Sequence, residues 1–233
     1  MNALPRRALA EFLGSTFLVA VVVGSGIMAV RSSPNDVGLQ LLENAFATGA
    51  GLVALILAFG SVSGAHFNPI VSIVDARLGG LTTRELGAYV GAQIAGACTG
   101  SILANLMFDL PAIEWSTKSR SDSGLWLAEV VATVGLLLVI FGSTRTNARA
   151  TPFAVGGYIG AAYFFTSSTS FANPAVTIGR TLSNTFAGIE PASVPAFIGA
   201  QLVGAAVGYG LIRVLFPTVD AAAAVVPHHE ESP

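Results

Sequence analysis

Six stretches of the chain are apolar over a length that, allowing for short polar interruptions, suits a helix crossing a membrane. Such a helix needs about 20 mostly apolar residues, because the hydrocarbon core of a bilayer is about 30 Å thick. The predicted spans are residues 8–30, 39–60, 86–108, 125–142, 153–167 and 194–216. This pattern predicts an all-α membrane protein with six transmembrane helices.

Two further segments are too short to cross a bilayer, and each begins with Asn-Pro. They are residues 68–78, starting at Asn68-Pro69, and residues 173 to about 186, starting at Asn173-Pro174. Asparagine is a favourable helix cap and proline a favourable first helical residue. A helix over residues 68–78 would be about 16 Å long, roughly half of the hydrocarbon core. We therefore predict two re-entrant half-helices whose capped ends line a water-filled cavity.

The chain also contains an internal repeat. Ala10-Glu11 recurs as Ala128-Glu129, the Asn-Pro pair recurs as described, and Gly91-Ala-Gln93 recurs as Gly199-Ala-Gln201, all in the same order. Repeat one covers about residues 8–108 and repeat two about residues 125–216, followed by a tail over residues 217–233. Each repeat holds three spans, an odd number, so the second is expected to be inverted relative to the first.

Glycines in the third and sixth spans predict close packing between helices, because the absence of a side chain lets two backbones approach. These glycines are Gly87, Gly91, Gly96, Gly100, Gly199, Gly204 and Gly208.

Composition narrows the possible partners and cofactors. The chain is 53% hydrophobic and only 10% charged, with a mean hydropathy of +0.71, whereas soluble domains are about 25% charged. A net charge of −2 without a basic cluster excludes nucleic acid as a partner. The single Cys98 lacks nearby ligands for zinc, and the His228-His229-Glu230-Glu231 tail lacks residues to complete a site. We predict no metal and no cofactor.

The basic residues orient the predicted spans. If both termini are cytoplasmic, the cytoplasmic segments hold Arg6, Arg7, Arg77, Arg84, Arg145, Arg149 and Arg213. The opposite side then holds only Arg31, Lys118, Arg120 and Arg180. Cytoplasmic loops carry an excess of Lys and Arg, so this bias predicts that both termini are inside and that the polar linker over residues 109–124 is outside.

Taken together, Ser63-Gly-Ala-His-Phe-Asn-Pro69, Asn173-Pro-Ala175, Ala10-Glu-Phe12 and Gly91-Ala-Gln93 resemble the aquaporin, or major intrinsic protein, family over nearly the whole chain. The resemblance implies a right-handed bundle of six helices with two re-entrant half-helices and one pore in each subunit. It also implies a homotetramer surrounded by membrane lipid. Members conduct water or small uncharged solutes passively.

The resemblance assigns the central constriction to the two Asn-Pro motifs. Asn68 and Asn173 would present amide donors to a passing oxygen, and the two positive helix N-termini would disfavour cations. The predicted central residues are Asn68, Pro69, Ile70, Asn173, Pro174 and Ala175. In most relatives the first motif ends in alanine, so Ile70 departs from the pattern.

The resemblance also gives roles to three buried polar residues. Glu11 and Glu129 are expected to hold the re-entrant loops by hydrogen bonds. His66 is expected to brace a loop or to form part of the pore wall. The alternative is a proton-coupled secondary transporter in which Glu11 or Glu129 carries the proton, since intramembrane carboxylates often mark such paths.

The outer selectivity filter departs from the common family pattern, because Val176 stands where most aquaporins have arginine. By the family spacing, the other filter positions are Thr48, Ala161 and Ser170. None of the four is charged or large, which predicts a wider and less cation-averse constriction. Arg180 lies one helical turn later and either reaches the outer vestibule or pairs with a loop carbonyl or a lipid headgroup.

These filter residues predict passage of solutes bulkier than water, such as glycerol, other polyols or neutral arsenous acid. Uncharged filters with valine at this position resemble a bacterial branch associated with arsenic resistance, which implies a location in the bacterial inner membrane. An enzyme is disfavoured because the chain has no His-Glu-x-x-His pattern and no Gly-x-Ser-x-Gly site with placeable partners.

Overall fold

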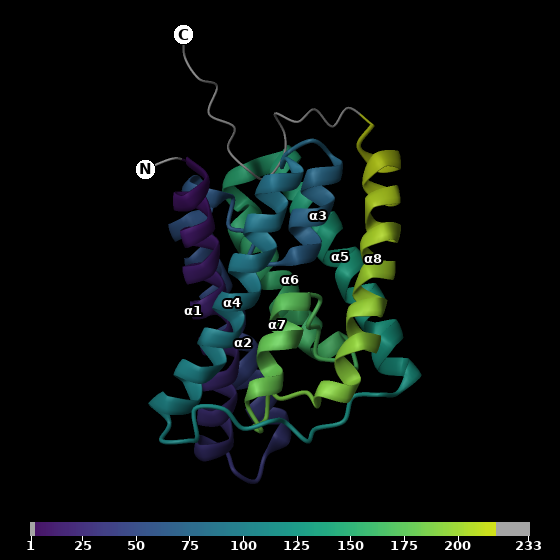
Figure 1. Ribbon diagram of the computed structural model, residues 1–233. Coiled ribbons are helices and arrows are strands. Elements are labelled where there is room, and N and C mark those ends of the chain that lie inside the picture. Colours follow the sequence, from purple (N-terminus) through teal and green to yellow (C-terminus); the bar gives the residue numbers. More distant parts are fainter. Residues whose placement is uncertain (1–2, 218–233) are drawn as a thin grey trace.

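The computed structural model describes residues 3–217, and all of its regular elements within that range are helical (Figure 1). The helices are α1 (Ala3–Ser32), α2 (Val37–Ser63), α3 (Pro69–Arg77), α4 (Thr83–Met107), α5 (Ser123–Asn147), α6 (Thr151–Phe165), α7 (Pro174–Gly179) and α8 (Val194–Leu215). Short 3₁₀ turns cover Ala148–Ala150, Arg180–Leu182 and Pro191–Ser193. Of the predicted tail, residues 218–233 lie outside the described residues.

Six long helices, α1, α2, α4, α5, α6 and α8, correspond to the six predicted spans. Among the described residues, five segments have the length and composition to cross a membrane, and one of them, Ser123–Phe165, has 43 residues. A single helix of that length would be about 65 Å long, twice the hydrocarbon core. This segment instead contains α5 and α6, joined by a 3₁₀ turn, so it crosses twice. The predicted all-α bundle of six spans and two half-helices is confirmed.

The first long helix begins and the last long helix ends at the same end of the bundle. In Figure 1, α1 begins and α8 ends at one end of the bundle, which we call the terminal end. The connection between α4 and α5 runs along the opposite end, which we call the linker end. Helix α3 lies in the half near the terminal end, and α7 lies in the other half. The two half-helices therefore begin near the middle of the molecule and point away from each other.

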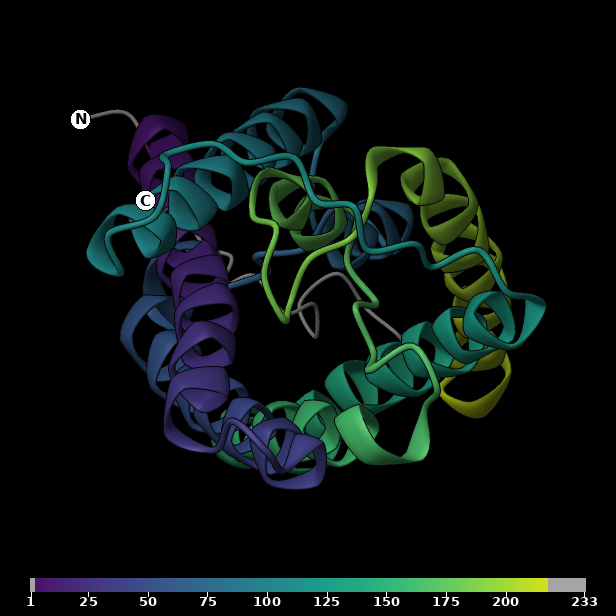
Figure 2. The same ribbon diagram turned by 90° about the horizontal axis from the view of Figure 1, so that it is seen from below.

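The long helices form a ring, and the half-helices complete it from inside. Helix α1 packs on α2 and α4, α5 packs on α6 and α8, and α2 packs on α6. Both α3 and α7 pack on α4 and α8 and so connect the two halves of the ring. The view from the linker end shows this ring, with the half-helices on its inner side (Figure 2).

The second half-helix is shorter than predicted. We expected it to run to about residue 186, but α7 ends at Gly179 and a 3₁₀ turn follows. The carbonyls that a longer helix would use are bonded elsewhere. The Thr181 carbonyl accepts from the backbone N–H of Ser116 at 2.9 Å, and the Leu182 carbonyl accepts from the Asn105 side chain at 3.0 Å. Contacts from the linker and from α4 thus end this helix early.

Only some of the predicted packing glycines lie between helices. A Cβ atom at Gly96 would lie 2.3 Å from the Phe12 carbonyl oxygen, and one at Gly204 would lie 2.9 Å from the Val130 carbonyl oxygen. Gly100 and Gly208 are similarly crowded. The prediction was wrong for three positions, where an added Cβ would meet nothing within 4 Å: Gly87, Gly91 and Gly199. Composition indicates that a helix packs closely but not which of its faces does so.

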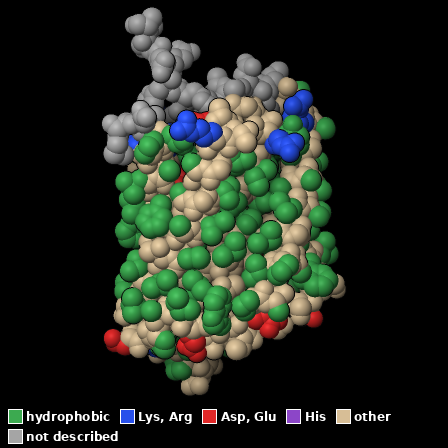
Figure 3. All heavy atoms as spheres, in the orientation of Figure 1, with side chains coloured by type: hydrophobic (Ala, Val, Ile, Leu, Met, Phe, Trp, Pro, Cys, Tyr) green, Lys and Arg blue, Asp and Glu red, His purple; other side chains and the backbone are tan. Residues whose placement is uncertain are grey.

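The outer surface is that of a membrane protein. Hydrophobic side chains cover the middle of the molecule, Lys and Arg gather at the terminal end, and Asp and Glu gather at the linker end of the visible face (Figure 3). Phe46 and Val214, for example, are 75% and 76% exposed. Apolar side chains with such exposure are stable in lipid rather than in water. The chain is therefore an integral membrane protein.

Candidate functional site

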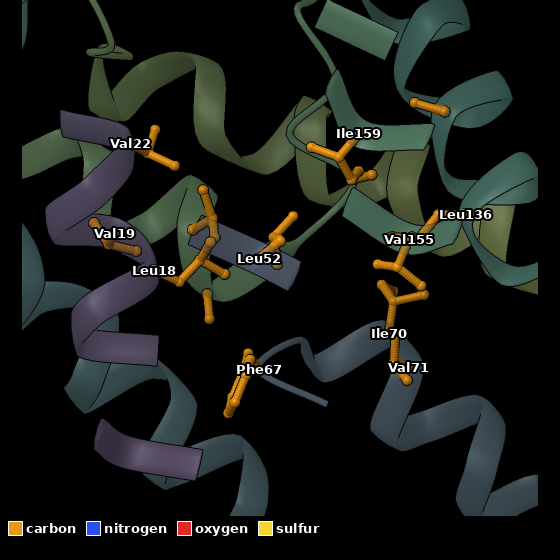
Figure 4. Close-up of a cluster of buried hydrophobic side chains, with 14 of the residues drawn as sticks. Leu18, Val19, Val22, Leu52, Phe67, Ile70, Val71, Leu136, Val155 and Ile159 are labelled. Carbon is orange, nitrogen blue, oxygen red and sulfur yellow. The ribbon is translucent and has the colours of Figure 1, made fainter. Parts of the chain in front are cut away.

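A narrow cavity of about 80 Å³ lies inside the ring of helices. Since one water needs about 10–15 Å³ of such space, a short file of water-sized molecules fits. Most of its wall is apolar, and Figure 4 shows the labelled side chains of α1, α2, α5 and α6 around one central space. Apolar lining residues include Leu18, Val22, Leu52, Leu136, Val155 and Ile159. The polar lining comes largely from the two re-entrant loops.

Asn68 and Asn173 lie in the cavity wall and cross-link the two loops. The Asn68 amide Nδ2 donates to the Ala172 carbonyl at 2.7 Å, and the Asn173 Nδ2 donates to the Phe67 carbonyl at 2.8 Å. Each Oδ1 accepts from the first turn of its own half-helix, at 2.9 Å from Ile70 N–H for Asn68. Each amide thus has its oxygen occupied and one N–H left for the cavity.

The other four residues predicted at the central constriction do not line the cavity. They are buried, but the cavity wall does not include them: Pro69, Ile70, Pro174 and Ala175. Each occupies the first or second position of a half-helix, and Ile70 and Ala175 pack in the hydrophobic core. Only the capping asparagines reach the cavity, so Ile70 does not narrow it.

The backbone before each asparagine has a left-handed conformation. Phe67 has φ 47° and Ala172 has φ 45°, and their carbonyls are those that accept from the opposite asparagine. Positive φ is uncommon for residues other than glycine and costs on the order of 1–3 kcal/mol. Neighbouring contacts must therefore hold both loops in place.

Glu11 provides such contacts for the first loop. Its carboxylate accepts hydrogen bonds from the Ser63 hydroxyl at 2.6 Å, the His66 N–H at 3.0 Å, the Phe67 N–H at 2.7 Å and the Gln93 side chain at 2.7 Å. Glu11 is fully buried and does not line the cavity. Its oxygens are occupied by donors of the loop and of α4.

Glu129 makes the equivalent set of contacts in the second loop. Its carboxylate accepts from the Ser168 hydroxyl at 2.6 Å, the Phe171 N–H at 2.9 Å, the Ala172 N–H at 2.8 Å and the Gln201 side chain at 2.7 Å. It too is fully buried and outside the cavity wall. A proton carrier would need access to the solute path, so this geometry favours bracing of the loops over proton coupling.

His66 lies in the cavity wall on the side of α3. Its Nδ1 is 3.0 Å from the Ser72 hydroxyl, and its ring packs edge-on against Tyr89 with 5.5 Å between centroids. The Nε2 atom is buried and has no hydrogen-bond partner among the described residues. The imidazole is therefore held in place while one polar edge remains unpaired.

Three of the four predicted filter residues line the cavity: Thr48, Ser170 and Val176. The prediction of Ala161 was wrong, because Ala161 is exposed on the outside of α6. Tyr163 lines the cavity instead, and its hydroxyl is 3.1 Å from the Thr48 hydroxyl. Residues two positions apart in a helix differ by about 200° in direction, so this small error in spacing selects the opposite face.

Arg180 also lines the cavity, and it is only 2% exposed. Its Nε donates to the Ala187 carbonyl, and its guanidinium carbon lies 3.4 Å from the centre of the Phe171 ring. Arg180 thus pairs with a loop carbonyl, which is one of the alternatives drawn from the sequence, and it also borders the cavity. Arg180, which is charged, and Tyr163, which is large, line the same cavity as Thr48, Ser170 and Val176.

Arg120 was not singled out by the sequence, yet it fastens the linker to the second loop. Its backbone N–H donates to the Ser193 hydroxyl at 2.9 Å, its Nε to the Gly188 carbonyl at 3.1 Å, and its Nη1 to the Ser168 carbonyl at 3.2 Å. Figure 2 shows the linker crossing the linker end of the ring. Burial lowers the pKa of Arg120 to about 10, which leaves it charged at neutral pH.

Replacing Arg120 with methionine is expected to lower the free energy of unfolding by about 3–6 kcal/mol, because two hydrogen bonds from a charged group are lost. Thermal unfolding of the purified protein in detergent measures this change. Arg149→Met is the control, because Arg149 is exposed. Equal melting temperatures for the two variants would contradict a bracing role for Arg120.

The family model described as "Major intrinsic protein" matches residues 2–170. The aquaglyceroporin AqpS of Rhizobium meliloti is 52% identical over 210 residues, which cover 90% of each protein. Aquaporin Z of Rhodopseudomonas palustris is 30% identical over 227 residues, covering 90% of this chain and 92% of that protein. The X-ray structure of the aquaglyceroporin from Plasmodium falciparum superposes with a TM-score of 0.72 and 23% identity, covering 93% and 98% of the two chains.

Proposed function

The chain belongs to the major intrinsic protein family, and we propose that its filter passes solutes bulkier than water. The protein is a passive channel for water and small uncharged solutes. The proposed solutes are glycerol, other small polyols and neutral metalloid hydroxides such as arsenous acid. The name of the 52% identical relative, an aquaglyceroporin, supports the first of these.

The observation that carries the proposal is the mixed wall of the cavity. The long helices contribute mainly apolar residues, Leu52 and Val155 among them, and the re-entrant loops contribute the amide donors of Asn68 and Asn173. A polyol has a similar composition, because its carbon chain is apolar and its hydroxyl groups are polar. Such a solute can exchange water for protein hydrogen bonds while its C–H groups contact the apolar residues.

The assignments of site residues are part of the proposal. Asn68 and Asn173 form the central constriction. Thr48, Tyr163, Ser170 and Val176 form the outer filter. Glu11 and Glu129 brace the loops, and His66 forms part of the pore wall. The protein has no catalytic role.

The assembly and orientation are also proposed. We place the protein in a bacterial inner membrane as a homotetramer, with a pore in each subunit formed by repeats 8–108 and 125–216. The terminal end faces the cytoplasm, because it carries most of the Lys and Arg visible in Figure 3. Crosslinking in native membranes and protease protection of each end test these two statements.

Replacing Val176 with arginine is expected to reduce glycerol and arsenite flux at least tenfold, with a smaller loss of water flux. Val176 borders the cavity beside Arg180 and Tyr163, so a second guanidinium there would narrow the outer constriction. Stopped-flow light scattering of proteoliposomes measures all three fluxes. Val176→Ala is the control that keeps the path open. Unchanged glycerol and arsenite flux in the arginine variant would reject a filter role for this position.

A further inference from the structure

The cavity wall contains a cation despite the valine that follows Asn-Pro-Ala. Arg180 is four residues after Val176, and both side chains line the same cavity. Four residues advance a helix by about 6 Å and turn it by about 40° beyond one full turn. Helical side chains lean towards the helix N-terminus, so a long side chain from the later position can reach back over the earlier one.

The guanidinium of Arg180 is held in a fixed position. Its Nε donates to the Ala187 carbonyl, and its guanidinium carbon lies 3.4 Å from the centre of the Phe171 ring. Its two Nη atoms form no hydrogen bond with the described residues, and neither is a buried atom without a partner. These donors therefore remain available to molecules in the cavity.

No carboxylate neutralises this charge. Among the described residues the one ion pair is Arg7 with Glu85, which is far from Arg180 in the fold. Glu129 is the acidic group that acts on Arg180, and four other donors already occupy its oxygens. Arg120 also lies near the Phe171 ring, with its guanidinium carbon 4.9 Å from the ring centre.

Lys118 adds a further positive group at this end. Its Nζ donates to the Phe186 carbonyl at 2.8 Å. Burial, together with the charges of Arg120 and Arg180, lowers the pKa of Lys118 to about 8. Lys118, Arg120 and Arg180 therefore lie near one another at the linker end, and of these three Arg180 lines the cavity.

We propose that Arg180 is the fixed cation of the outer constriction and a specificity-determining residue of this channel. It excludes small cations, and its Nη groups donate to the hydroxyl oxygens of uncharged solutes. Val176, the residue after Asn-Pro-Ala, then keeps the solute path wide, and Arg180, one turn later, supplies the charge. This inference rests on the proposed channel function.

The test uses the full chain in proteoliposomes, with methylammonium as the cation probe and water and glycerol as neutral probes. In Arg180→Met and Arg180→Gln we expect methylammonium influx to rise at least tenfold. In the Met variant the ratio of glycerol flux to water flux should also fall at least twofold, because the Nη donors for the solute hydroxyls are lost. Arg180→Lys should retain exclusion. In the double variant Val176→Arg, Arg180→Met, the relocated cation should restore exclusion and reduce glycerol flux.

Arg31→Met is the matched control. Arg31 also lies near the linker end, donates to a loop carbonyl, that of Phe108, at 2.7 Å and packs on an aromatic ring. It does not line the cavity, so its loss should leave methylammonium excluded.

The outcomes separate this inference from the proposed function. A wild-type protein that carries neither water nor glycerol would reject the channel itself. A conducting wild type with Met and Gln variants that also conduct, yet still exclude methylammonium, would overturn the role of Arg180 alone. If Arg180→Met does not fold, the methylammonium influx of Arg180→Gln is compared with that of Arg180→Lys. Both variants keep a hydrogen-bond donor and only the lysine keeps the charge, so equal influx would overturn the role of the charge.

Discussion

Replacing Glu11 with alanine is expected to lower the free energy of unfolding by at least about 4 kcal/mol. Four buried donors would lose their acceptor: the Ser63 hydroxyl, the backbone N–H groups of His66 and Phe67, and the Gln93 amide. Each unsatisfied buried donor costs about 1–3 kcal/mol. Thermal unfolding in detergent, followed by circular dichroism, measures the loss. Most of the variant should fail to reach the membrane in a folded form.

Glu129 makes the equivalent contacts in the second loop, so the same prediction can be tested there. Glu129→Ala should cause a loss of similar size, because its carboxylate also accepts four hydrogen bonds. Glu114→Ala is the control, since Glu114 is exposed on the linker. Wild-type melting of either buried variant would contradict the bracing role. The transporter alternative is tested by the wild type, whose solute flux should be independent of a proton gradient, and by a glutamine variant that folds, which should retain that flux.

The strained loops explain why these carboxylates are needed. Phe67 and Ala172 have positive φ, and this conformation directs their carbonyls to the opposite asparagine. The strain is offset because the N–H groups of the same two residues donate to Glu11 and Glu129. Each glutamate therefore stabilises the residue that positions the amide in the other loop. Loss of one carboxylate should disturb both asparagines.

The features found from the sequence were those repeated in both halves of the chain. The Asn-Pro pairs and the two glutamates recur at equivalent places, and a recurrence constrains position more strongly than a single motif. The charges of both glutamates within apolar segments also required buried partners. The structure supplies those partners from the loops and from Gln93 and Gln201.

Features that depend on direction around a helix or on distant contacts could not be found in this way. Counting along α6 placed Ala161 in the filter, whereas Tyr163, two residues later, lines the cavity. The polar linker was predicted, but the contact of Arg120 with Ser168 joins residues 48 positions apart. Whether the Arg180 side chain reaches the cavity depends on where α7 ends. That end is set by contacts with α4 and with the linker.

Replacing Thr48 with tryptophan is expected to reduce the flux of water and glycerol at least tenfold. Thr48 lines the cavity, and its hydroxyl oxygen lies 3.1 Å from that of Tyr163. The whole cavity is about 80 Å³, so an indole ring at this position would fill its outer part. Stopped-flow light scattering measures both fluxes, and the melting temperature reports whether the variant remains folded.

Ala161→Trp is the matched control, because it adds the same ring at the position that family spacing assigns to the filter. Ala161 is exposed on the outside of α6, where an indole would meet lipid and leave the cavity unchanged. Its fluxes should therefore equal those of the wild type. The reverse result, a blocked Ala161→Trp channel and an open Thr48→Trp channel, would mean that the solute does not pass through this cavity. Wild-type flux in both variants would place the narrowest part of the path away from Thr48, towards Asn68 and Asn173.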